Sequence, residues 1–185
     1  MAIKTFSTGE VLTSGDTNTY LANAGWNYIT SGALSSAVNF AGCFSATYTN
    51  YRVVCTIDSH TGGAANIFAF PLSGTTPNTT AANYKSSGHE QAWGGGSTLV
   101  VFGNDGAAAG WAVGRVAGDG SSAIFYCEFL NPFASARTFY KSEYVDGAYS
   151  GRLGGLLTVT TSYDGIRFTG PTMTGTVTIY GYRKA

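Results

Sequence analysis

The chain of 185 residues is long enough for one domain with a short appendage, and 44% of its residues are hydrophobic, which is enough for a core. Ten basic and ten acidic residues cancel, so the charge balance does not favour binding to nucleic acid or to an anionic membrane. Charged residues make up only 11% of the chain, so its surface must depend on Ser, Thr, Asn and Gly for solubility, which favours a place in a larger assembly.

The first 24 residues differ from the rest, and we expect residues 1–24 to form an attachment segment. Ser14 is a suitable N-cap and Gly25 a suitable stop, so residues 14–23 have the pattern of a short helix. A helix of this length is not stable alone and must dock on its own domain or on a neighbouring subunit. The candidate attachment residues are Phe6, Val11, Leu12, Tyr20 and Leu21.

The remainder, residues 25–185, alternates apolar and polar residues with period two between clusters of Gly, Ser and Asn, which predicts strands. The expected strands are 51–57, 67–72, 99–102, 111–116, 123–130, 136–144, 155–162, 165–168 and 175–182. Many short strands with regular turns are typical of an antiparallel β-sandwich, so the predicted fold is all-β and jelly-roll-like. We expect 99–102 to pair with 111–116, and 74–96 to be an exposed excursion.

The residues that usually carry chemistry are few and scattered. Cys43, Cys55 and Cys127 have apolar neighbours and form no Cys-x-x-Cys pair, so we expect buried thiols rather than a disulfide framework. His60 and His89 belong to no metal-binding helix pair, and no nucleophile elbow or phosphate-binding loop is present. No apolar run approaches the ~18 residues of a membrane span. The sequence therefore predicts no enzyme, cofactor, metal site or membrane segment.

Aromatic residues make up 14% of the chain, more than core packing requires. Some lie at alternating strand positions and are expected in the core: Phe125, Phe129, Phe139 and Phe168. Others are expected in loops: Tyr84, Trp93, Tyr149 and Tyr163. The segment 84–93 combines rings with polar groups, so Tyr84, His89 and Trp93 are candidate contacts for a glycan or a protein partner.

Three blocks of this sequence resemble a group of small bacteriophage virion proteins, usually described as minor structural or tail proteins. The blocks are FSTGEVLTSGDTNTYL (6–21), FSATYTNYRVV (44–54), and SYDGIRF (162–168) followed by GTVTIYGYR (175–183). They occur in the familiar order and reach from one end of the chain to the other. Residues 74–120 match nothing in the group.

The resemblance implies a β-sandwich on the surface of a phage head or tail, made in the cytoplasm of a bacterial host and often trimeric. Its partners would be capsid or tail proteins, held by the N-terminal segment. The leading hypothesis is a non-enzymatic decoration or fibre-type component. The alternative is a receptor-binding knob whose loops recognise host surface polysaccharide, and a depolymerase is a third hypothesis that no acid–base pair in the sequence supports.

Overall fold

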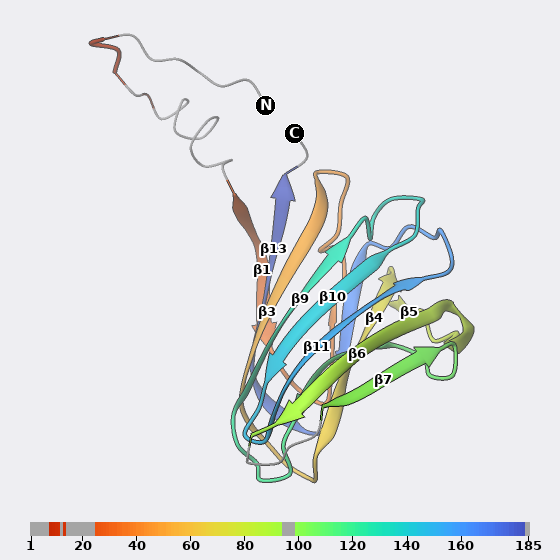
Figure 1. Cartoon of the computed structure of the whole chain (residues 1–185). Helices are drawn as coiled ribbons and strands as arrows, with labels where there is room; N and C mark the ends of the chain where they lie inside the picture. Colours follow the sequence, from red (N-terminus) through yellow and green to blue (C-terminus); the bar gives the residue numbers. More distant parts are fainter. Residues whose placement is uncertain (1–7, 12, 14–24, 94–98, 184–185) are drawn as a thin grey trace.

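A computed structural model describes residues 8–11, 13, 25–93 and 99–183, and its strands form two antiparallel sheets (Figure 1). The larger sheet has eight strands, in the spatial order β1 (Trp26–Ala33), β13 (Met173–Arg183), β3 (Tyr48–His60), β9 (Ala123–Leu130), β10 (Phe139–Val145), β11 (Tyr149–Leu157), β6 (Tyr84–Ala92) and β7 (Val100–Asp105). The smaller sheet runs β2 (Ala37–Phe40), β12 (Gly165–Thr169), β4 (Ala65–Ser73), with β5 (Thr76–Pro77) and β8 (Trp111–Val116) both paired to β4.

The two sheets pack against each other, so the predicted all-β sandwich is confirmed. The finer jelly-roll assignment stays a prediction. The described residues contain no α-helix and one short 3-10 helix, η2 (Ala81–Asn83), while the helix expected over 14–23 lies outside them.

The core lies where alternating side chains of both sheets meet. On β9 each second side chain is buried, and on β10 the alternation continues with Tyr140, Ser142 and Tyr144 inside. Trp111 of the smaller sheet is fully buried among rings of the larger one, with ring centroids 4.8 Å from Tyr140 and 5.7 Å from Phe129. Such ring contacts fix the two sheets relative to each other as well as burying apolar area.

Strand β8 pairs with β4, and two of its carbonyl groups accept hydrogen bonds from side chains of β10. The Tyr140 hydroxyl donates to the Ala112 carbonyl at 3.2 Å, and the Ser142 hydroxyl donates to the Val113 carbonyl. Buried carbonyl groups without partners are costly. These two hydroxyl groups therefore supply partners for carbonyl groups of a strand that pairs with β4 alone.

Several strand predictions match closely, and others are wrong. The expected strands 111–116 and 123–130 coincide with β8 and β9. The expected pairing of 99–102 with 111–116 is wrong, because β7 pairs with β6 while β8 pairs with β4 in the other sheet. The expected excursion at 74–96 is also wrong, because it contains β5 and the nine-residue strand β6.

The strand expected over 155–162 is misplaced, because β11 ends at Leu157 and begins six residues before Gly155. Glycines hide its alternation in the sequence, and they have a packing function. A Cβ on Gly151 would overlap the ring of Tyr144, which lies directly opposite on β10. Gly155 stands in the same way opposite Tyr140. Gly151 and Gly155 therefore make room for the buried tyrosines of the neighbouring strand, and Gly155 also leaves space for the backbone of Lys85 on β6.

The predicted core is largely confirmed, since Phe125, Phe129 and Phe168 are buried, as are all three cysteines. Phe139 is an error: it is 42% exposed, because the register of β10 buries Tyr140 and turns its neighbour outward. The expected loop residue Tyr163 is buried as well. Local alternation fixes the two faces of a strand but not which face meets the core.

Candidate functional site

The expected attachment residues fall mostly in the part of the chain outside the described residues. Phe6, Leu12, Tyr20 and Leu21 belong to that part. Val11 is described, and 78% of its side chain is exposed. Its role in attachment stays a prediction.

Tyr84 was expected to offer its ring to a glycan or partner, and the structure contradicts this. The side chain is fully buried at the start of β6, with its ring centroid 5.5 Å from that of Trp111. Its hydroxyl donates to the Asn78 carbonyl at 2.5 Å, and burial raises its pKa. Tyr84 is therefore a core residue, because strand β6 turns this position towards the smaller sheet.

His89 and Trp93 are accessible, so their contact role stays a prediction. His89 lies on the exposed face of β6 opposite Arg152 of β11 and Val101 of β7. Trp93 is 55% exposed just after β6, and its indole nitrogen donates to the Asp146 carbonyl at 3.0 Å. The structure does not bring Tyr84 to the surface with them, so the proposed three-residue site is not formed.

A different set of aromatic residues gathers on one surface, which we call the aromatic face. Its residues belong to β1, β13, β3 and β9, which are neighbouring strands at one end of the larger sheet (Figure 1). Its members are Trp26 and Tyr28 of β1, Tyr180 and Tyr182 of β13, Arg52 of β3 and Tyr126 of β9. The ring centroids of Trp26 and Tyr182 are 3.7 Å apart, and those of Tyr28 and Tyr180 are 6.3 Å apart. Tyr28 and Tyr182 are exposed.

Arg52 lies at the centre of the aromatic face. Its guanidinium carbon is 5.0 Å from the centroid of the Trp26 ring and 5.5 Å from that of Tyr126, so it makes cation–π contacts on both sides. Glu128, its cross-strand neighbour, pairs instead with Lys141 at 2.8 Å. None of the described carboxylates forms an ion pair with Arg52. The guanidinium therefore keeps hydrogen-bond donors for a partner.

Sequence reasoning missed the aromatic face, although a signal was present. Trp26 and Tyr28 are two residues apart, as are Tyr180 and Tyr182, and that spacing places both rings of a pair on one face of a strand. What the spacing does not give is the pairing of β1 with β13, which sets Trp26 opposite Tyr182. The face is made by two strands from opposite ends of the chain.

No protein-family model matches the chain, and no curated protein shows significant sequence similarity to it. Within the described ranges, no group of three or more His, Cys, Asp or Glu side chains is placed to hold a metal ion. The same ranges contain no helix that is long and apolar enough to span a membrane.

Proposed function

We propose that this chain is a non-enzymatic structural component of a bacteriophage particle, a decoration or fibre-type protein that self-associates, as a trimer, through the aromatic face. The three sequence blocks that resemble phage virion proteins support the particle assignment. The observation that carries the assembly is the group of rings around Arg52, in which Tyr28 and Tyr182 are exposed and the other rings are half-buried.

The composition of the aromatic face is that of an interface centre. Trp, Tyr and Arg dominate the binding energy of protein interfaces, because they combine large apolar area with a polar end. Leaving such rings in water is unfavourable by about 25 cal/mol for each Å² of apolar surface. A second copy can cover Tyr28 and Tyr182, and its carbonyl groups can accept hydrogen bonds from Arg52.

The position of the aromatic face also suits assembly on a particle. Residues 1–24 precede Trp26, the first residue of β1, so the proposed attachment segment joins the sandwich beside this face. Three copies that meet here would carry three attachment segments. Linked binding events can strengthen attachment by roughly 10²–10⁴-fold without any new contact. A weak individual segment would then be sufficient to hold the protein on a capsid or tail.

The assembly is tested by light scattering coupled to size-exclusion chromatography of the full chain. We expect a trimer mass for the unaltered protein and a shift to monomer for Trp26→Ala combined with Arg52→Ala. Loss of two central residues should weaken association by roughly 100-fold or more. Phe139→Ala is the matched control, because Phe139 is an exposed ring on the same sheet outside the aromatic face, and it should leave the trimer intact.

A monomeric unaltered protein would contradict the assembly, and so would a trimer that survives the double substitution. The particle assignment has its own measurement: mass spectrometry of phage particles purified from the producing host. The chain should be recovered in fixed proportion to the capsid protein, and its absence from washed particles would refute the assignment.

A further inference from the structure

A cavity of about 450 Å³ opens between the two sheets on the side of β6 and β7. Strands β4 and β8 of the smaller sheet line one side of it, and strands β6, β7, β10 and β11 of the larger sheet contribute the other. Its volume lies within the roughly 300–1,000 Å³ of small-molecule sites. This cavity is separate from the aromatic face, and it shares no lining residue with it.

An enclosed ion pair lies in the cavity wall. Arg115 donates from Nη1 to Glu90 Oε1 at 2.6 Å, and the Tyr144 hydroxyl donates to Glu90 Oε2 at 2.5 Å. The side chains of Glu90 and Arg115 are only 14% and 18% exposed. Enclosing two charges costs more free energy than enclosing apolar residues of the same size. Stability alone does not account for the pair, and polar groups converging in a cavity indicate a binding site.

The polar groups of the cavity are held in place before any ligand arrives. The guanidinium of Arg115 lies 3.8 Å from the centroid of the Tyr149 ring, which fixes its plane. Gly151 leaves the space that the ring of Tyr144 occupies. Groups that are already ordered lose little conformational entropy when a ligand binds.

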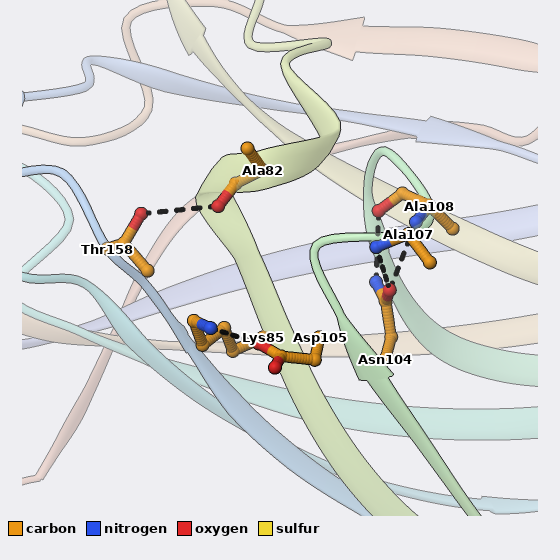
Figure 2. Close-up of polar contacts among 7 residues, drawn as sticks. All are labelled: Ala82, Lys85, Asn104, Asp105, Ala107, Ala108 and Thr158. Carbon is orange, nitrogen blue, oxygen red and sulfur yellow. Dashed lines mark hydrogen bonds and ion pairs between the residues drawn. The ribbon is translucent and has the colours of Figure 1, made fainter.

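The loop between β7 and β8 forms a further part of the wall, and the side chain of Asn104 braces it (Figure 2). Asn104 Oδ1 accepts from the amides of Ala107 and Ala108 at 2.8 and 3.0 Å, and Nδ2 donates to the Ala108 carbonyl at 2.9 Å. Figure 2 also shows the ion pair between Lys85 of β6 and Asp105 of β7. The loop therefore has a fixed shape beside the cavity.

We propose that this cavity binds an uncharged saccharide unit. Because the charges of Glu90 and Arg115 cancel, neither an anionic nor a cationic ligand gains from net attraction. The carboxylate still has acceptor lone pairs, and the guanidinium still has N–H donors. Donors and acceptors side by side match sugar hydroxyl groups, which donate and accept at once.

The remaining lining suits the same ligand. Phe68 and Leu153 offer apolar surface, against which the C–H face of a sugar ring packs. Ser86 and Asn66 add neutral polar groups. Saccharide binding goes beyond the proposed structural role, and it depends neither on trimer formation nor on the particle.

The test is saturation-transfer NMR on the full chain with single sugars as probes. The neutral probes are glucose, galactose, mannose, rhamnose and N-acetylglucosamine, and the charged ones are glucuronic acid and glucosamine. We expect saturable binding of at least one neutral sugar, with a Kd of about 1 mM or tighter, and weaker binding of both charged sugars.

Two variants locate the binding. Glu90→Gln keeps the shape of the side chain and removes the charged acceptor, so affinity should fall about tenfold or more. Ala108→Phe places a ring on an exposed wall residue without touching the ion pair, and it should abolish binding. This second variant keeps the proposal testable if Glu90→Gln lowers the yield of folded protein.

Glu143→Gln is the matched control, because Glu143 forms an exposed ion pair with Arg152. It should leave the Kd unchanged. Binding of no neutral sugar would overturn the proposal, as would preference for a charged sugar. Full affinity in both Glu90→Gln and Ala108→Phe would also overturn it, because the sugar would then bind elsewhere.

Discussion

Arg115 and Arg52 both lie against aromatic rings, but in opposite surroundings. Arg115 is enclosed in the cavity wall, 3.8 Å from the Tyr149 ring centroid and paired with Glu90. Arg52 lies between two rings of the open aromatic face, and no described carboxylate pairs with it. The same type of side chain is thus enclosed and neutralised by a carboxylate in the cavity wall. On the aromatic face it is accessible and keeps its charge.

The difference shows how the surroundings decide what an arginine can bind. In the cavity, the carboxylate of Glu90 cancels the charge and holds the guanidinium still, which favours a small neutral ligand of complementary shape. On the aromatic face, unpaired donors beside exposed rings favour a broad protein surface. We therefore contrast a rigid interior region with an exterior region for which we propose association.

The largest expected effect concerns the interior, where alkaline pH should destabilise the fold. Burial raises the pKa of Cys43 to about 12, and it also raises the pKa values of Cys55 and Cys127. Unfolded thiols ionise near pH 8.5, so the native state binds more protons above that pH. The contribution of the thiols to the free energy of unfolding should be constant below pH ~8, and the free energy should then fall by up to about 4 kcal/mol per pH unit for three thiols.

Urea unfolding at a series of pH values measures this loss. The matched variant replaces all three cysteines by alanine, and it should remove most of the slope between about pH 8.5 and 10. Above pH ~10 a further fall should remain, because burial also raises the pKa values of Tyr84, Tyr140 and Tyr144. If the free energy of unfolding did not change up to pH ~10, the thiols would have the same pKa in the folded and unfolded states. That result would contradict their burial.

Much of the interior could be predicted from the sequence. Alternation identified β8 and β9 to the residue and placed Phe125 and Phe129 in the core, because burial on one face imposes a local pattern. It failed on β11, where glycines that accommodate Tyr140 and Tyr144 interrupt the pattern. It also failed on Phe139, whose outward position depends on which face of β10 meets the smaller sheet.

Neither the cavity nor the aromatic face could be predicted from local sequence patterns. Glu90 and Arg115 are 25 residues apart and belong to different sheets, so only the closed sandwich brings them together. The aromatic face likewise joins β1 and β13 from opposite ends of the chain. Sequence placed Tyr84 in a loop because residues 74–96 are rich in polar and small residues, and the partner strands of β6 could not be identified in advance.

The second-largest expected effect is the loss of stability when the enclosed ion pair is removed. Glu90→Ala leaves Arg115 without its carboxylate and the Tyr144 hydroxyl without its acceptor, so unfolding free energy should fall by about 2 kcal/mol. The double variant Glu90→Ala with Arg115→Ala should lose less than the sum of the two single losses. Urea unfolding at neutral pH measures all three, and strictly additive losses would mean that the two side chains do not interact.

The smallest expected effect is the loss of stability when an exposed ion pair is removed. Glu143 Oε1 lies 3.2 Å from Arg152 Nε, and both side chains are more than half exposed, at 53% and 69%. Exposed pairs contribute little because water and salt screen them. Glu143→Ala should therefore change the free energy of unfolding by roughly 0.5 kcal/mol or less, and added salt should remove the difference. If this loss equalled that of Glu90→Ala, the stability of the enclosed pair would owe nothing to burial, and the contrast between the two regions would fail.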